Sequence, residues 1–305
     1  MLRKAQRAPC ILVTGSNGQV GFELRRSLAS LGEVVAWDRS ACDLRDADGL
    51  RARIRALHPD VIVNAAAWTD VDGAESAVEE AFAVNGVAPG ILAEEARALG
   101  GLLVHYSTDY VFDGRGETFY RETDDAAPLS VYGRSKLAGE QAVAAAGASA
   151  IVLRTSWVAG LHGRNFARQV LSQGLERDAL TVVNDQHGAP TTAALIADVT
   201  ARIIDRAWLH GDRASFPGGV YHLAAAGETS RHGYATEVLR YAASRGAVLK
   251  AGPERVEAVA STRYPQVARR PANSRLDTRK LRETFDIYLP DWRSGVHYLI
   301  DQFLK

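Results

Sequence analysis

A tyrosine and a lysine four residues apart, Tyr132 and Lys136, are the pair in this chain best suited to proton transfer. They open an alanine-rich run to Ala146 that predicts a helix, and residues four apart on a helix share a face. A neighbouring ammonium favours the phenolate and lowers the pKa of a tyrosine. We therefore expect Tyr132 to exchange a proton with a carbonyl oxygen near neutral pH. Because such a pair arises by chance about once in six chains of this composition, a simple helix-surface contact is the alternative.

Three polar residues, Ser107, Thr108 and Asp109, precede this pair in the chain. They follow an apolar run, residues 102–106, that predicts a buried strand. In open α/β sheets, ligands bind beyond the carboxyl ends of the strands. We therefore expect these three side chains at the ligand-binding edge of a sheet.

A glycine-rich turn near the N-terminus predicts a dinucleotide site. The apolar run 10–14 is followed at once by Gly15, Gly18 and Gly21, and then by helical spacing of apolar residues over 22–31. Such glycines let the backbone approach a pyrophosphate, which binds to amide groups at the helix N-terminus. An ordinary turn between strand and helix is the alternative.

The next strand, residues 34–37, ends at Asp38, about 20 residues after the first glycine, where an acid meets the adenosine ribose. An acid there favours NAD, whereas the adjacent Arg39 is suited to the 2′-phosphate of NADP. The residues leave that choice open. Asp43 either lines an adenine site or caps the helix expected over 46–57.

Strands and helices alternate over residues 10–155, with further strands expected at 60–67 and 150–154. This alternation predicts an α/β fold, a Rossmann-type doubly wound parallel sheet over residues 10–156 that binds NAD(P). The less regular residues 157–305 predict a smaller α/β substrate-binding domain, with some segments returning to the Rossmann domain. Residues 1–9 are basic and precede no apolar core, so we expect a disordered leader and not a signal peptide.

The composition excludes several classes of protein. The formal net charge is zero, which argues against nucleic acid or an anionic membrane as the main ligand. No run reaches the ~18 apolar residues of a membrane span. Cys10 and Cys42 form no CxxC motif, which fits a reducing cytoplasm. The eight histidines form no HxH or HxxxH pair, so we expect no metal site.

Taken in chain order, the glycine turn, Asn64-Ala65-Ala66, Ser107-Thr108-Asp109 and Tyr132-x3-Lys136 resemble the extended short-chain dehydrogenase/reductase superfamily. Longer motifs are similar to one branch of it, the reductases of nucleotide-linked 4-keto sugars. Those motifs span residues 18–21, 63–67, 105–112, 154–158, 184–191 and 268–276. The resemblance covers nearly the whole chain from residue 11 to residue 292.

The resemblance implies a cytoplasmic oxidoreductase that reduces the 4-keto group of dTDP-4-dehydro-L-rhamnose with NADPH, NADH also being accepted. By that similarity Tyr132 donates a proton to the sugar O4, Lys136 holds the nicotinamide ribose and Thr108 binds the same carbonyl. The implied cofactor-binding residues are Gly15, Gly18, Gln19, Val20, Gly21, Asp38, Asp43, Leu44, Ala66, Ala67, Thr69, Tyr132 and Lys136. The implied residues for the dTDP-sugar are Thr108, Asp109, Trp157, Asn165 and Arg270.

One departure from the family concerns metal binding and assembly. Some members bind Mg²⁺ through glutamates at a dimer interface, and Glu23 matches one of those positions. Ala194 stands where another glutamate would be. We therefore expect no metal here, and a homodimer without a bridging ion stays open.

Two other activities are compatible with the same scaffold. A sugar-nucleotide dehydratase or epimerase is the first, but a dehydratase carries a second carboxylate where this chain has Tyr110 after Asp109. A non-catalytic regulatory relative is the second. The presence of Thr108, Tyr132 and Lys136 argues against it.

Overall fold

A computed structural model describes residues 7–264 and 266–305 of the chain. Its centre is a six-stranded sheet in the order β10-β5-β4-β3-β1-β2, with every neighbouring pair parallel. The strands are β1 (Cys10–Thr14), β2 (Glu33–Trp37), β3 (Val61–Asn64), β4 (Leu102–Thr108), β5 (Ser149–Thr155) and β10 (Gly219–His222). The expected doubly wound parallel sheet is confirmed.

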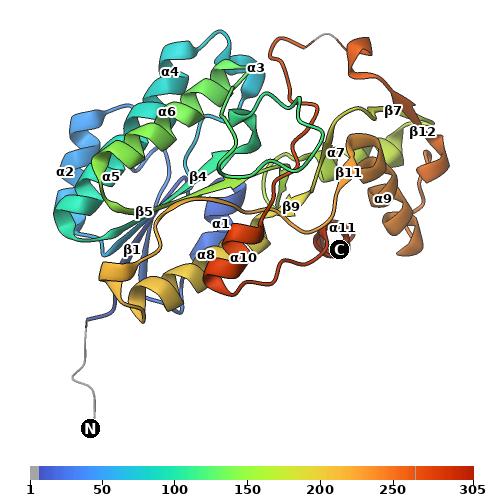
Figure 1. Ribbon diagram of the computed structural model, residues 1–305. Helices are drawn as coiled ribbons and strands as arrows, with labels where there is room; N and C mark the ends of the chain where they lie inside the picture. The colour runs from blue at the N-terminus through green and yellow to red at the C-terminus, as the bar shows by residue number, and fades with distance from the viewer. Residues whose placement is uncertain (1–6, 265) are drawn as a thin grey trace.

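Helices cover both faces of this sheet (Figure 1). One face is covered by α2 (Ala47–Leu57), α5 (Ala88–Leu99) and α6 (Val131–Ala146). The other is covered by α1 (Gln19–Ser27), α8 (Ala193–Ile203), its π-helical extension η3 (Ile204–Leu209) and α10 (Arg279–Phe285). Because both faces are covered, the inner strands are apolar along their length and do not alternate with polar residues.

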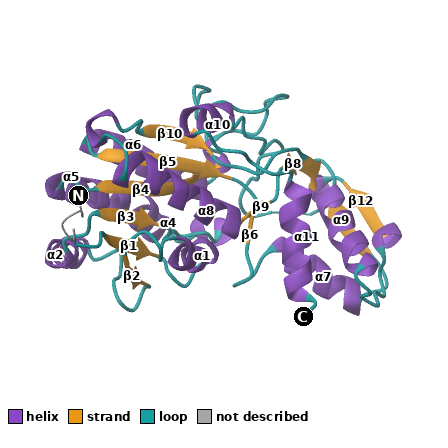
Figure 2. Cartoon of the chain, turned by 90° about the horizontal axis from the view of Figure 1, so that it is seen from below, coloured by secondary structure: helices purple, strands orange, loops and turns teal. Residues whose placement is uncertain are grey.

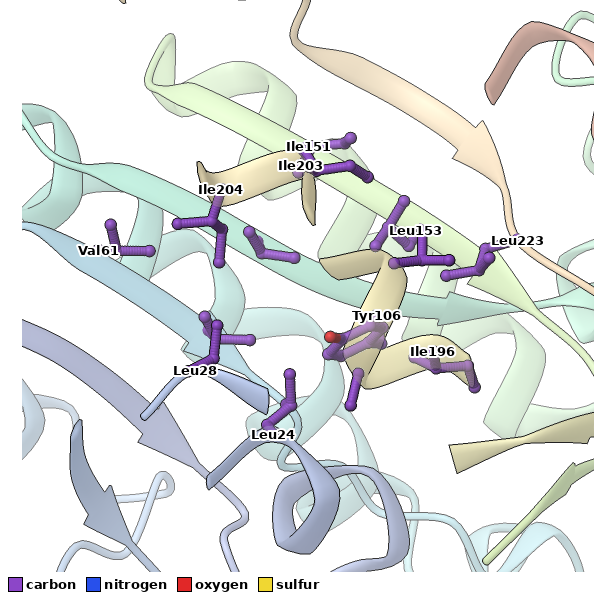
Figure 3. Close-up of a cluster of buried hydrophobic side chains, with 14 of the residues drawn as sticks. Leu24, Leu28, Val61, Tyr106, Ile151, Leu153, Ile196, Ile203, Ile204 and Leu223 are labelled. Atoms are coloured by element: carbon purple, nitrogen blue, oxygen red, sulfur yellow. The ribbon is translucent and has the colours of Figure 1, made fainter. Parts of the chain in front are cut away.

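The core between the sheet and the second helix layer is drawn in Figure 3. Leu24 and Leu28 of α1 and Ile196 of α8 pack against strand residues such as Val61 and Leu153. Tyr106 of β4 brings one hydroxyl into this cluster, and that hydroxyl is hydrogen-bonded to Thr200 Oγ1 at 2.6 Å. The buried phenol is therefore paired, as a buried polar group must be.

The connection between β3 and α5 is a series of short helical segments. They are α3 (Val71–Ala74), α4 (Val78–Phe82) and the π-turn η1 (Ala83–Val87), which runs directly into α5. The buried side chain of Asn85 ties this series to the segment that follows β3, since it accepts from Trp68 N and donates to Trp68 O. A 3-10 turn, η2 (Asp109–Val111), follows β4.

A second group of helices lies beyond the carboxyl ends of the main-sheet strands (Figure 2). It comprises α7 (Phe166–Glu176), α9 (Arg231–Ser244) and α11 (Trp292–Phe303), with a core that includes Tyr234 and Trp292. Short strands border these helices: β6 (Val158–Ala159), β7 (Leu180–Val183), β8 (His187–Gly188), β9 (Thr191–Thr192), β11 (Thr229–Ser230) and β12 (Val256–Val259). The remaining 3-10 turns are η4 (Arg213–Ser215), η5 (Pro253–Arg255) and η6 (Ser261–Arg263).

The chain beyond residue 157 contributes to both groups. Strand β10 pairs with β5 in the main sheet, and α8 and α10 cover that sheet. Of the leader expected over residues 1–9, residues 1–6 lie outside the described residues, and Pro9 O accepts a hydrogen bond from Glu33 N at 2.8 Å. Among the helices that the structure describes, none combines the length and apolar character that crossing a membrane requires.

Candidate active site

A cavity of about 870 Å³ runs along the carboxyl ends of β1, β3, β4 and β5 and reaches the first turns of α7 and α9. Most of the residues that the sequence assigned to a site line it. They are Gly15, Gly18, Gln19, Val20, Asp38, Asp43, Leu44, Ala66, Ala67, Thr69, Thr108, Asp109, Tyr132, Lys136 and Trp157. Among the described residues, the lining does not include Gly21, Asn165 or Arg270.

The glycine turn brings bare backbone to one end of this cavity. Gly15 has a φ of +66°, and a Cβ there would lie 2.5 Å from Ala66 N, so only glycine fits. Gly21 has a packing role, because its Cβ would lie 2.1 Å from Gly15 O. Gly18 precedes α1 without a side-chain cap. The amide groups of this first turn therefore face the cavity end with no capping side chain, which fits the pyrophosphate of a dinucleotide.

Asp38, at the end of β2, is held as an oriented carboxylate. It accepts hydrogen bonds from the Ser40 hydroxyl at 2.6 Å, the Ala41 amide at 3.0 Å and Asn17 Nδ2 at 2.7 Å. The Ser40 hydrogen bond leads the contacts that hold the pKa of Asp38 below its usual range. The exposed Arg39 follows it on the cavity lining. Both residues are therefore available to an adenosine ribose.

The two roles left open for Asp43 are separated by the structure. Asp46 is the N-cap of α2, where it accepts from Gly49 N at 3.0 Å. Asp43 instead pairs with Arg45 at 2.5 Å, and hydrogen bonds from Arg45 lower its pKa to about 2. Asp43 thus lines the cavity as a paired carboxylate beside Leu44.

Tyr132, Thr108 and Asp109 meet where α6 begins against the end of β4. Ser130 caps α6 by accepting from Gly133 N at 3.1 Å. A Cβ at Gly133 would lie 2.3 Å from Tyr110 O, so glycine lets the helix start this close to the strand end. The Tyr132 phenol then lies near Thr108, whose hydroxyl donates to Asp109 Oδ1 at 3.0 Å.

Burial is the largest influence on the pKa values of Tyr132 and Asp109. It raises the pKa of Tyr132 above its usual value, with the Thr108 hydrogen bond acting in the opposite direction. It also raises the pKa of Asp109 to about 6. Asp109 Oδ2 is buried and has no hydrogen-bond partner among the described residues. A ligand hydroxyl would therefore satisfy an atom that the protein leaves unpaired.

The expectation that Lys136 lowers the pKa of Tyr132 is wrong for this structure. The Lys136 ammonium donates to the Tyr106 carbonyl at 2.6 Å, and the phenol's pKa is set by burial. Burial also lowers the pKa of Lys136 to about 8. The phenol is consequently held protonated, which is the state that a proton donor requires.

Lys136 also ends a row of buried polar side chains that crosses three strands. Its Nζ lies 3.4 Å from His105 Nε2, and His105 Nδ1 lies 3.0 Å from Asn64 Nδ2. Asn64 Oδ1 accepts from the Thr14 hydroxyl at 2.6 Å. Sequence reasoning missed His105 as a neighbour of Lys136, although a histidine inside an otherwise apolar strand is the signal that would have found it.

Two residues of α9 on the cavity lining were also missed. Arg231 places its guanidinium carbon 3.9 Å from the centroid of the Trp157 ring, and Tyr234 stacks on the same ring at 6.4 Å. Trp157 adopts a φ of +48°, unusual for a residue other than glycine. Trp157 is far from Arg231 and Tyr234 in the chain, and only tertiary packing brings the three together, so no local motif marks them.

Asn165 and Arg270, which the resemblance assigned to the nucleotide, have other partners. Asn165 caps α7 by accepting from Arg168 N at 3.0 Å and donates to Gly160 O at 2.8 Å. Arg270 donates to Asp72 Oδ2 of α3 at 2.7 Å. Both side chains are therefore engaged within the protein.

The positions implicated in metal binding hold no cluster of ligands. Within residues 7–264 and 266–305, no three His, Cys, Asp or Glu side chains gather in a way that could hold a metal ion. Glu23 pairs with Arg26 at 3.2 Å. Ala194 lies in the first turn of α8, which packs against α1.

Comparison with known sequences shows the family of this chain. A family model described as the RmlD substrate binding domain matches residues 9–305. The dTDP-4-dehydrorhamnose reductase of Burkholderia thailandensis is 48% identical over 298 residues, which are 97% of this chain and 99% of that protein. The dTDP-4-dehydrorhamnose reductase of Escherichia coli K12 is 44% identical over 296 residues, 96% and 97% of the two chains.

Solved structures agree with this assignment. A dTDP-4-dehydrorhamnose reductase from Clostridium acetobutylicum superposes with a TM-score of 0.88 at 31% identity, over 97% of this chain and 100% of that one. The Bacillus anthracis dTDP-4-dehydrorhamnose reductase in complex with NADP gives 0.87 at 28% identity over the same shares. A Thermus thermophilus UDP-glucose 4-epimerase, at 21% identity and a TM-score of 0.73, shares the fold.

Proposed function

Since this chain belongs to the dTDP-4-dehydrorhamnose reductase family, we propose that it reduces dTDP-4-dehydro-L-rhamnose to dTDP-L-rhamnose with NADPH, the last step of dTDP-rhamnose synthesis. One observation carries the proposal: a single cavity joins the glycine turn to Thr108, Tyr132 and Lys136. A hydride donor bound on the turn and a keto sugar bound at the end of β4 would share that cavity.

NADPH supplies the hydride when bound, and the protein supplies the proton. Tyr132 is the proton donor to the sugar O4, and its raised pKa keeps the phenol protonated until negative charge develops on that oxygen. Thr108 holds the same oxygen, since a hydroxyl that donates to Asp109 can rotate toward a ligand. Lys136, which lines the same cavity, holds the nicotinamide ribose.

The substrate half of the cavity fits a polar sugar next to an aromatic wall. Asp109 offers an unpaired buried oxygen for a sugar hydroxyl, and Trp157 lines the same half of the cavity. Tyr110 follows Asp109, so a second carboxylate for elimination is not at this place in the chain. The residues therefore support reduction over dehydration.

The cytoplasm is the compartment that we infer for this reaction. Both cysteines, Cys10 and Cys42, are free and buried. Free thiols persist under reducing conditions such as those of the cytoplasm. Cell fractionation that finds the protein outside the cytoplasm would overturn this inference.

The test is a panel of 4-keto nucleotide sugars assayed with NADPH and with NADH. We expect NADPH to be consumed with dTDP-4-dehydro-L-rhamnose and the product to be dTDP-L-rhamnose by NMR. The matched control is dTDP-glucose, which has no keto group and should consume no NADPH. Release of an epimerised or dehydrated sugar without net NADPH consumption would contradict the proposal.

A further inference from the structure

The substrate half of the cavity contains a cation whose charge no protein group balances. Within residues 7–264 and 266–305, the Arg231 guanidinium takes part in no ion pair and donates no hydrogen bond, although it lines the cavity. The other arginine close to this place, Arg270, is paired with Asp72. Arg231 is half-buried, and a partly desolvated cation without a protein partner is available to an anionic ligand.

The surroundings of Arg231 hold it in place without neutralising it. Its guanidinium lies over the ring of Trp157 and 5.2 Å from the centroid of Phe166. Burial lowers the pKa of Arg231 from its usual value, and the ionisable groups around it are Tyr110, Asp109, Tyr234 and Arg270. Asp109 is the carboxyl among them, and it forms no ion pair with Arg231.

A second unpaired polar group lies beside the first. Tyr234 is 1% exposed, lines the cavity, and its hydroxyl has no hydrogen-bond partner among the described residues. Its ring is fixed by stacking on Trp157 and by contact with Phe166 at 5.1 Å. The Arg231 guanidinium and the Tyr234 phenol are both hydrogen-bond donors, and neither has an acceptor among the described residues. Oxygen atoms of a ligand could therefore accept from both.

Gly188 of β8 is part of the same arrangement. A Cβ at Gly188 would lie 2.7 Å from Trp157 Cε2 and 3.0 Å from Nε1. The indole thus fits against Gly188 only because this residue has no side chain, and the Arg231 guanidinium lies over the same ring. The strained φ of Trp157 is retained because these neighbours fix the ring.

We propose that Arg231 and Tyr234 bind the diphosphate of the nucleotide sugar, with Trp157 as the surface on which the guanidinium is held. The chemical class that this site takes is a nucleoside diphosphate. A planar guanidinium binds phosphate oxygens in a bidentate manner, and the phenol donates to a further oxygen. The inference rests on the proposed function for the identity of the sugar, but not for the binding of the diphosphate.

The test measures binding of dTDP and of thymidine to the full chain saturated with NADP⁺, by calorimetry. Arg231→Gln should weaken dTDP about 10–100-fold, equal to about 1.4–2.8 kcal/mol, and leave thymidine unchanged. Arg231→Lys should give a smaller loss, about 3–10-fold, because the charge stays and the fork is lost. Tyr234→Phe should cost about 2–5-fold, the worth of one hydrogen bond.

Arg240→Gln is the matched control, because Arg240 is on the same helix with its guanidinium paired to Glu237 outside the cavity. It should bind dTDP as the wild type does. Titration of NADP⁺ into each variant reports whether the fold is intact. Wild-type dTDP affinity in Arg231→Gln would overturn the proposal, as would an equal loss for dTDP and thymidine, which would make the arginine a support for Trp157 only.

One further variant, Arg270→Gln, and an assay of 4-keto sugar reduction separate this proposal from the reductase function. If Arg270→Gln abolishes dTDP binding while Arg231→Gln does not, the diphosphate is bound by Arg270 and the proposal is wrong. If dTDP binding depends on Arg231 but no 4-keto sugar is reduced, the site stands and the proposed function fails. Different experimental results therefore refute diphosphate binding by Arg231 and reduction of the 4-keto sugar.

Discussion

Replacing Tyr132 by phenylalanine tests the proton donor with the smallest structural change. The ring keeps its edge-to-face contact with Tyr110, at 5.4 Å between centroids, and loses only the hydroxyl beside Thr108. The glycine turn at the other end of the cavity is untouched. We therefore expect kcat to fall and the affinity for NADPH to stay within about twofold, since no pyrophosphate contact changes.

The size of the loss follows from the role. A positioned general acid contributes about 10²–10⁴-fold, which is about 2.7–5.4 kcal/mol of activation free energy at ~1.36 per decade. Thr108→Val removes one hydrogen bond to the developing alkoxide and should cost less, about 2–4 kcal/mol at most. Lys136→Met should lower both kcat and NADPH affinity, because it removes a ribose contact as well as the charge.

Two measurements on each variant separate these outcomes. The rate of NADPH oxidation at saturating sugar gives kcat, and fluorescence titration of NADPH gives its dissociation constant. If Tyr132→Phe turns over at a near-normal rate, the tyrosine is structural, and Asp109 or a water delivers the proton. If it loses NADPH binding in parallel with kcat, the hydroxyl positions the cofactor.

Four further results are expected. Because Asp109 has a folded pKa of about 6 against 3.8 unfolded, its contribution to stability is present below pH ~4 and lost as pH rises through ~6. The free energy of unfolding of Asp109→Asn, measured with urea, should therefore rise by about 2–3 kcal/mol relative to the wild type between pH ~4 and pH ~8. A difference between the two proteins that does not change with pH would refute this. Gly188→Ala should displace Trp157 and raise KM for the sugar about tenfold or more, with unchanged NADPH titration; an unchanged KM contradicts the clash. Arg39→Ala should weaken NADPH more than NADH in paired titrations; equal losses exclude a 2′-phosphate role. Adding Mg²⁺ or EDTA should change neither activity nor sedimentation. Dissociation of a dimer by EDTA would contradict the expectation that no metal bridges it.

The sheet and most of the cofactor half were predictable because their signals are local. An apolar strand followed at once by Gly15, Gly18 and Gly21 specifies its own turn, and the structure places a strand, a turn and a helix there. Tyr132 and Lys136 sit on one helix, so their spacing alone placed them on one face. What spacing could not give was the environment: burial of the phenol outweighs any effect of the ammonium on its pKa.

The substrate half was less predictable because it is assembled from distant segments. Arg231 comes from the start of α9 and Trp157 from the end of β5, and only tertiary packing joins them. Conversely, Arg270 looked like a phosphate ligand by its neighbours in sequence, but Asp72, far away in the chain, already pairs with it. A sequence shows which side chains carry charge, whereas only the fold shows which charges are already neutralised.

Hydrogen bonds link a row of side chains from Lys136 through His105 and Asn64 to Thr14, and donation along this row has a direction. A neutral imidazole carries one hydrogen and one lone pair, so its two ring nitrogens must play opposite parts. When Lys136 is charged it donates to Nε2, and Asn64 must then turn its oxygen to His105. When Lys136 is neutral, its lone pair can accept from Nε2–H, and the hydrogens in the row can then point the other way. Since Thr14 directly precedes Gly15, the charge state of Lys136 is coupled to hydrogen positions at the base of the glycine turn.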